Sequence, residues 1–348
     1  MNPPTPVMAA KLYIPSPRVK AVHRPRLIER LNEGLDRKLT LISASAGFGK
    51  TTLAGAWAAG CPRPLAWLTL DEGDNEVSRF LTHVVAALKT ISEPIGDDVL
   101  RLLQSERPPS AESMLAMVLN DLSRLAFPFV LVLDDYHVLS ARPVTECMNV
   151  LLEHAPLSMH LVIVTRENPP FPLGRLRARG HLTELRAADL CFTREEAAEF
   201  LREMVGFSLT AGQIASLESR TEGWIAGLQL AALSMRGRED ITAFIRAFAG
   251  DNRYIVDYLV EEVLERLPEE MRDFLLHTSI LDRLHGPLCD AVTGQEGGSA
   301  RLRHLEEGNF FVVALDDARQ WYRYHHLFAE VLSAHLKADR PERAAELH

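Results

Sequence analysis

The sequence predicts an α/β fold in its first half, with a parallel sheet between layers of helices, followed by a mostly helical second half. Three observations lead to this prediction. Short apolar segments alternate with helical segments up to about residue 185, which is typical of a parallel sheet covered on both faces. One apolar segment runs into a glycine-rich loop and then into a helix-forming segment. From about Thr193, helical periodicity replaces the strand pattern until a hairpin near the end.

The composition indicates a globular protein with an acidic balance of charge. The chain has 348 residues, of which 47% are hydrophobic and 24% charged, and its formal net charge is −9. An acidic chain is a poor candidate for direct DNA binding, because neutralisation of phosphates dominates that affinity. No apolar run approaches the ~18–20 residues that span a bilayer. The 4 scattered cysteines indicate free thiols, so we expect a cytoplasmic protein without a membrane segment.

The elements of the first half follow from its apolar runs. Residues 1–20 are rich in proline and are expected to be extended, and residues 21–190 are expected to form one domain. Helices are expected around 25–31 and over 77–90 and 110–125. Strands are expected at 39–42, 64–70, 129–133, 160–165 and 182–185.

The second half is predicted to contain two smaller modules. Thr193 and Glu196 have the spacing of a capping box that opens a helix, and helices continue to about residue 250, so we expect a helical module at 191–255. More helices and then two β-rich runs around an Asp-Asp turn indicate a winged-helix module at 256–340. The chain ends inside a predicted helix at 341–348, which we interpret as the start of a truncated helical region.

The most informative segment is the octapeptide Ala44–Thr51, A-S-A-G-F-G-K-T, which lies between a predicted strand and a predicted helix. This context predicts a phosphate-binding loop, although Ala44 stands where the first glycine is usual. Glycines let backbone N–H groups converge on phosphate oxygens, and the next helix directs its positive end at the same anion. The lysine would reach the outer phosphates and the threonine hydroxyl would bind Mg²⁺. The predicted nucleotide-binding residues are Ala46, Gly47, Phe48, Gly49, Lys50, Thr51 and Thr52.

Two further strand ends complete the predicted site. Asp134 would orient Mg²⁺ together with Thr51, and Asp135 would polarise an attacking water. Arg166 follows the fourth strand and would sense the γ-phosphate, because ligands bind at the carboxyl ends of the strands in such sheets. The predicted catalytic residues are therefore Asp135, Lys50 and Arg166. The alternatives are a solvated turn for the two acids and a surface position for Arg166.

Two other groups of residues admit more than one interpretation. Arg175, Arg177 and Arg179 either contact phosphate or form a solvated arginine face. The adjacent His325 and His326 lack further partners at metal-binding spacing, so an interior or interdomain position is the simpler interpretation.

Taken in order, the motifs of this chain resemble a known family. They are Lys11–Pro15, Arg24–Leu27, Ala46–Thr52, Trp67–Asp71, Leu133–His137, Leu176–Gly180, Thr221–Trp224 and Trp321–Phe328. This set resembles the ATP-binding part of the large LuxR-type transcriptional regulators of the maltose-regulon activator type. That group belongs to the signal-transduction ATPases with numerous domains (STAND). The resemblance covers nearly the whole chain.

The resemblance implies a P-loop nucleotide-binding domain of the ASCE/STAND type, a helical arm and a winged helix that together bind ATP or ADP with Mg²⁺. It implies a switch with slow ATP hydrolysis, which is closed with ADP and self-associates with inducer and ATP. A C-terminal sensor and helix-turn-helix, absent from this sequence, would bind inducer and DNA. By the same resemblance Val22 and Arg24 lie near the adenine, and His325 reads the β-phosphate. Gly223–Ile225 stands where related ATPases have a Gly-x-Pro motif, with Ile225 in place of the proline.

Three alternatives stay open. The first is a P-loop kinase for a small molecule, with Arg175–Arg179 as its lid. The second is a DNA-remodelling ATPase that uses its winged helix directly, against which the net charge of −9 argues. The third is a nucleotide-binding scaffold without hydrolysis.

Overall fold

The computed structural model describes residues 7–16, 22–238, 240–339 and 342, and the chain divides into two compact units. The first unit comprises 1–19, 24–43 and 50–189, and the second comprises 20–23, 44–49 and 190–348. The glycine-rich loop at 44–49 therefore packs with the second unit, although the strand before it and the helix after it belong to the first.

The first unit is built around a five-stranded parallel sheet in the order β2-β3-β4-β1-β5. Its strands are β1 (Leu39–Ser43), β2 (Leu65–Thr69), β3 (Phe129–Asp134), β4 (Met159–Thr165) and β5 (Leu182–Arg186). Every residue of β1, β3 and β4 is buried, which explains why apolar residues dominate their sequences. The predicted parallel sheet is confirmed, and its five strands begin and end within two residues of the expected positions.

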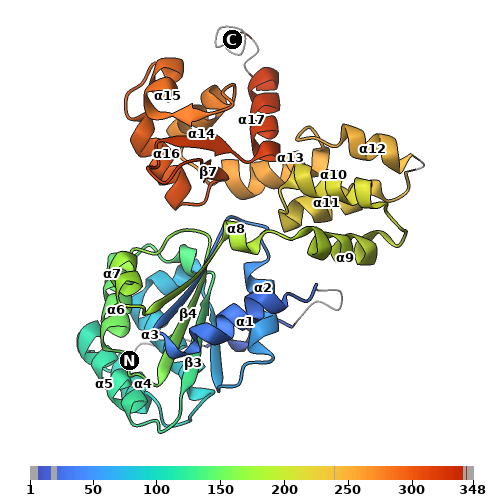
Figure 1. The fold of residues 1–348 in the computed structure, drawn as a ribbon. Helices are drawn as coiled ribbons and strands as arrows, with labels where there is room; N and C mark the ends of the chain where they lie inside the picture. Colours follow the sequence, from blue (N-terminus) through green and yellow to red (C-terminus); the bar gives the residue numbers. More distant parts are fainter. Residues whose placement is uncertain (1–6, 17–21, 239, 340–341, 343–348) are drawn as a thin grey trace. The chain divides into compact units, whose positions relative to one another are not determined.

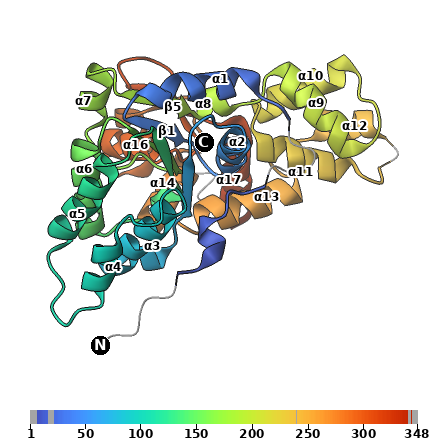
Figure 2. The same ribbon diagram turned by 90° about the horizontal axis from the view of Figure 1, so that it is seen from below.

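Helices cover both faces of this sheet. Figures 1 and 2 show α1 and α2 on one face and α3, α5 and α6 on the other. The helices of the first unit are α1 (Pro25–Glu33), α2 (Lys50–Ala58), α3 (Val77–Lys89), α4 (Asp97–Leu103), α5 (Ala111–Ser123), α6 (Arg142–His154) and α7 (Leu173–Ala178), and α8 (Ala187–Leu190) lies at its boundary. Short 3-10 helices occur at η1 (Ala9–Leu12), η2 (Gly34–Asp36), η3 (Glu72–Asn75) and η4 (Tyr136–Val138). The N-terminal segment was expected to be wholly extended, and η1 corrects that expectation for residues 9–12.

The parallel strands place the candidate site residues at one edge of the sheet. In the register, Ile42 of β1 lies opposite Val164 of β4, and Leu133 of β3 lies opposite Ile163. The carboxyl ends of these three strands are therefore neighbours, and the segments that follow them start from the same edge.

The second unit begins with a group of helices. They are α9 (Arg194–Val205), α10 (Ala211–Thr221), α11 (Ile225–Met235), α12 (Ile241–Ala247) and α13 (Arg253–Leu259). The predicted capping box at the start of α9 is confirmed, because Thr193 accepts a hydrogen bond from the Glu196 N–H and the Glu196 carboxylate accepts one from the Thr193 N–H.

The chain continues into helices that surround a small antiparallel sheet. A π-helical turn at Val260–Leu264 precedes α14 (Glu269–Thr278), β6 (Leu284–His285), α15 (Gly286–Thr293), α16 (Gly298–Glu307), β7 (Val312–Ala314), β8 (Trp321–Tyr324) and α17 (His326–Asp339). The sheet has the order β6-β8-β7, which is the arrangement of a winged helix. The predicted hairpin is confirmed as β7 and β8, with Asp316 accepting hydrogen bonds from the N–H groups of Gln320 and Trp321. The expected helical region at 341–348 lies, except for Glu342, outside the described residues.

Two expectations about the whole chain are tested by the described residues. None of their helices combines the length and the apolar character that a membrane crossing requires. The cysteines Cys61, Cys147, Cys191 and Cys289 are free thiols, as expected.

Candidate nucleotide-binding site

The loop between β1 and α2 has the backbone of a phosphate cradle. Gly47 and Gly49 have φ values of 79° and 72°, in the left-handed region that favours glycine. In the described part of the chain, no acceptor receives the N–H groups of Ala46, Gly47 or Gly49. Unsatisfied N–H groups in a glycine loop that opens a helix suit an anionic ligand.

The carbonyl side of this loop is covered by residues of the second unit. The Trp224 indole N–H donates to the Ala46 carbonyl oxygen over 3.1 Å, and the Ala226 N–H donates to that of Gly47 over 3.0 Å. A methyl group added at Gly47 would come within 2.5 Å of the Ala226 Cβ. At Gly49, an added methyl group would come within 2.9 Å of the Ile225 Cδ1. Glycine is thus required at positions 47 and 49, because the backbone is left-handed there and no room is left for a side chain.

In the first unit, a cluster of charged side chains lies where α2 begins and β3 ends. The Thr51 hydroxyl donates to Asp134 Oδ1 over 3.0 Å, and the Asp135 N–H donates to the same oxygen over 3.0 Å. Burial, and then the charge of Asp135, raise the pKa of Asp134 to about 6 against the opposing effect of these hydrogen bonds. Burial, and then the charge of Arg166, lower the pKa of Lys50 to about 8. The structure therefore brings together Lys50, Thr51, Asp134, Asp135 and Arg166.

These residues differ in exposure in a way that suits different roles. Asp134 is buried, whereas the Asp135 side chain is 45% exposed and its backbone is left-handed, with φ of 56°. A buried carboxylate beside a second acid is stabilised by a cation, and oxygen ligands such as Asp134 and Thr51 are those that Mg²⁺ prefers. No group of three or more His, Cys, Asp or Glu side chains in the described residues has the arrangement of a metal site. Mg²⁺ in phosphate sites typically uses only one or two protein ligands, with phosphates and waters supplying the rest.

Three other predicted residues are placed by the structure without a contact that tests their roles. Arg24 is buried at the start of α1, and Val22 is half-buried two residues before it. Thr52 is half-buried in the first turn of α2. Their roles toward a nucleotide stay predictions.

The structure distinguishes the two adjacent histidines. His325 is 5% exposed, and its ring lies 5.9 Å from Trp224 and 5.7 Å from Phe311 between centroids. Its Nε2 lies 2.9 Å from the Thr221 carbonyl oxygen, and its buried Nδ1 has no hydrogen-bond partner in the described residues. The His326 side chain is 68% exposed. His325, and not His326, is therefore the histidine beside the loop-binding tryptophan.

Sequence reasoning missed an ion pair between the helical and winged-helix segments. Arg323 of β8 donates two hydrogen bonds, of 2.8 and 2.7 Å, to the Glu222 carboxylate that follows α10. The His326 N–H donates to the same carboxylate over 3.0 Å. Burial would raise the pKa of Glu222, but Arg323 and the neighbouring groups lower it to about 2. No local pattern predicts this pair, because its members are 101 residues apart in the sequence.

Comparisons with known proteins agree with this architecture. Residues 260–344 match the MalT winged helix domain family. The chain is 33% identical over 349 residues to the serine/threonine-protein kinase PknK of Mycobacterium tuberculosis, which covers 99% of this chain and 31% of the relative. It is 33% identical over 344 residues to the HTH-type transcriptional regulator MalT of Klebsiella pneumoniae, covering 98% of this chain and 38% of the relative.

Among solved structures, the fold is similar to the Walker-type ATPase PabY2304 of Pyrococcus abyssi. The TM-score is 0.61 at 17% sequence identity, with 91% of this chain and 98% of the other covered. The chain spans about a third of the length of the curated relatives that it matches.

Proposed function

This chain is a MalT-like STAND ATPase module with a MalT-type winged-helix domain, and we propose that it is an ATP/ADP-dependent conformational switch. In this proposal it hydrolyses ATP slowly and forms part of an inducer-dependent bacterial transcription activator. The ATP-bound form self-associates in the cytoplasm, and other parts of the activator bind the inducer and DNA.

One observation carries the proposal: the phosphate loop is hydrogen-bonded to the segment that also supports the winged helix. Trp224 and Ala226 bind the carbonyl oxygens of Ala46 and Gly47. Glu222, two residues before Trp224, forms the ion pair with Arg323 of the winged helix. A ligand that binds the N–H groups of the loop can therefore change the hydrogen bonds of its carbonyl groups. ATP and ADP could in this way stabilise different arrangements of the helical and winged-helix segments.

The charged cluster of the first unit supports the hydrolytic half of the proposal. Lys50 would bind the outer phosphates, and the more exposed Asp135 would take a proton from the attacking water. Thr51 and Asp134 would hold Mg²⁺, which neutralises phosphate charge when it is bound. Arg166, whose charge acts on Lys50, would bind the γ-phosphate. The remaining proposed contacts are the loop with the phosphates, Val22 and Arg24 with the adenine, and His325 with the β-phosphate.

The proposed boundaries are residues 21–190 for nucleotide binding, 191–255 for the helical arm and 256–340 for the winged helix.

The relatives favour a switch over a transferase. Proteins named as a kinase and as a transcriptional regulator match the same stretch at 33% identity. A stretch that occurs both in a protein named as a kinase and in one named as a transcriptional regulator is better suited to a common switching role than to either named activity.

The test compares nucleotide binding, turnover and mass on the same purified chain. We expect Lys50→Ala to abolish ATP and ADP binding by calorimetry, because the phosphates lose their main cation, while Lys89→Ala on α3 binds normally. Asp135→Asn should retain ATP binding and lose phosphate release. Unchanged affinity in Lys50→Ala would refute the phosphate-loop assignment.

Two further measurements separate the alternatives. Light scattering should give a larger mass with ATP than with ADP, and labelled γ-phosphate should be transferred only to water. Transfer to a small acceptor would favour the kinase alternative. Salt-sensitive DNA binding by this chain would favour the remodelling ATPase.

A further inference from the structure

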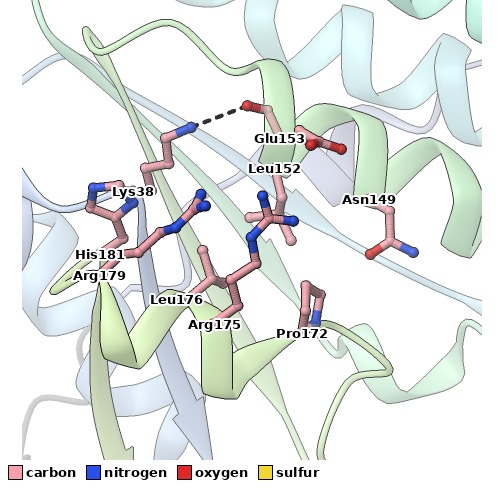
Figure 3. A pocket seen from close by; sticks show the side chains of 9 residues that line it. All are labelled: Lys38, Asn149, Leu152, Glu153, Pro172, Arg175, Leu176, Arg179 and His181. Atoms are coloured by element: carbon pink, nitrogen blue, oxygen red, sulfur yellow. Dashed lines mark hydrogen bonds between the residues drawn. The ribbon is translucent and has the colours of Figure 1, made fainter.

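A basic pocket lies within the first unit, at the amino ends of β1 and β5 (Figure 3). Lys38 and His181 line it directly before β1 and β5 begin, and the rest of its wall comes from α6 and from the segment around α7. The pocket has a volume of about 250 Å³. It therefore lies roughly 17 Å, the length of a five-residue strand, from the carboxyl end of β1.

From this pocket we infer a second ligand site, which binds a small molecule that carries a doubly charged oxyanion such as a phosphoryl group. Three permanent cations, Lys38, Arg175 and Arg179, face one carboxylate, Glu153. With His181 neutral, the charge of the lining is 3 − 1 = +2. A dianion therefore matches the charge of this lining.

The cations of the pocket form no ion pair within the described part of the chain. The side chains of Arg175 and Arg179 form no hydrogen bond or ion pair with any of the residues described here. The Lys38 Nζ donates to the backbone carbonyl oxygen of Glu153 over 3.1 Å, which leaves its charge without a counter-ion. Figure 3 shows both guanidinium groups turned into the pocket on the side of the Lys38 ammonium.

A third arginine, which lies between these two in the sequence, provides an internal comparison. Arg177 donates two hydrogen bonds, of 2.8 and 3.0 Å, to the carboxylate of Glu184 and does not line the pocket. Arg175 and Arg179 are four residues apart, and like charges at this spacing on a helical turn repel each other. Among the described residues, Arg177 therefore has a carboxylate partner, and Arg175 and Arg179 have none.

The chemistry of the lining fits an oxyanion rather than an apolar ligand. Planar guanidinium groups bind phosphoryl and carboxylate oxygens with two parallel hydrogen bonds. Leu152, Leu176 and Pro172 give one wall an apolar surface, which suits the carbon part of a small organic phosphate or dicarboxylate. The site is independent of the switch proposed above, because none of its residues belongs to the nucleotide site.

Inorganic phosphate is the first probe, and the full chain is first saturated with Mg²⁺ and ADP so that the glycine loop is occupied. We expect a saturable phosphate isotherm in calorimetry and a rise in melting temperature beyond that given by sodium chloride at equal ionic strength. Arg175→Gln and Arg179→Gln should each weaken phosphate binding roughly tenfold or more, because each removes a charge-assisted pair of hydrogen bonds. Succinate serves as the dicarboxylate probe in the same protocol, and tighter binding of succinate than of phosphate would identify a dicarboxylate ligand.

Arg177→Gln is the matched control and should bind phosphate like the wild type. Lys50→Ala, which we expect to lose nucleotide, should also retain the phosphate response, and this separates the pocket from the glycine loop. Melting curves without phosphate verify that each variant is folded. An absent or non-saturable response to both probes, or equal weakening in all three arginine variants, would overturn the inference.

Discussion

At the scale of single residues, the hydrogen bond of His325 determines which of its ring nitrogens carries a hydrogen. Nε2 faces the carbonyl oxygen of Thr221, which is only an acceptor, so this nitrogen must carry a hydrogen. In the neutral ring Nδ1 is then an acceptor and repels a phosphate oxygen. Burial lowers the pKa of His325, so the free protein favours the neutral ring. If Nδ1 contacts the β-phosphate, the ring must gain a proton when ADP binds.

We therefore predict that ADP binding is coupled to proton uptake at His325. Calorimetry in two buffers with different ionisation enthalpies should show uptake of part of a proton, and ADP affinity should fall as pH rises. His325→Ala should lose the uptake and weaken ADP more than ATP, whereas His326→Ala should behave like the wild type. Equal effects on ADP and ATP would remove His325 from the switch.

Gly47 allows a second prediction at this scale, because its φ of 79° and its contact with Ala226 both exclude a side chain. Gly47→Ala should lower the free energy of unfolding by ~1–3 kcal/mol and weaken ADP binding, since strain and overlap displace the loop. Gly212→Ala in α10 is the control, because an added methyl group there meets nothing within 4 Å. It should be neutral or stabilise by up to ~1 kcal/mol. Urea unfolding of both variants measures the difference, and an equal effect would contradict the assignment.

At the scale of elements, buried strands were predictable and short elements were not. Apolar residues dominate β1, β3 and β4, which are buried along their whole length, and that pattern is visible locally. The helix α6 was not expected, although Pro143 stands in its first turn, where proline favours the start of a helix. The strand β6 has only two residues, too few for any periodicity.

The same reasoning explains how much of the candidate site was predictable. Asp134 ends the buried strand β3 and Arg166 follows the buried strand β4, so their positions at strand ends predicted that they lie near Lys50. The hydrogen bond from Trp224 to Ala46 was not predictable from spacing, because 178 residues separate its partners in the chain. Trp224 is fully buried, which its size alone makes common, but burial does not reveal this bond.

The strand β4 contains a buried histidine that predicts a pH dependence of stability. His160 Nδ1 donates to the Arg37 carbonyl oxygen over 2.7 Å, and Nε2 accepts from the Thr40 hydroxyl over 3.0 Å, so the neutral ring is satisfied. Burial lowers the pKa of His160 from 6.5 to about 4. The unfolded chain therefore binds the proton more tightly than the folded chain between these two pH values.

We predict that the free energy of unfolding falls by up to about 3 kcal/mol from pH 6.5 to pH 4 on account of His160, and that this contribution levels off below pH 4. Urea unfolding across this range measures the slope. His160→Gln should flatten it, while His154→Gln, which changes an exposed residue of α6, should retain it. A slope unchanged in His160→Gln would contradict the prediction.

At the scale of the whole molecule, a switch requires contacts that exist in one nucleotide state and not in the other. The ion pair between Glu222 and Arg323 is a candidate, because it joins the helical segment to the winged helix within the second unit. The hydrogen bond from the His326 N–H adds to it. Glu222 itself has a left-handed backbone, with φ of 49°, which holds its carboxylate at the end of α10.

We predict that Arg323→Gln shifts the molecule toward the ATP-bound, self-associating form. Loss of ~1.4 kcal/mol from the closed form changes the ratio of the two forms tenfold. The ratio of ADP to ATP affinity should therefore fall up to about tenfold, and light scattering should detect self-association at lower ATP concentration. Arg266→Gln removes an exposed pair with Glu262 inside one helical segment and should leave both quantities unchanged. If Arg323→Gln matches Arg266→Gln in both measurements, the ion pair is structural and the switch depends on other contacts.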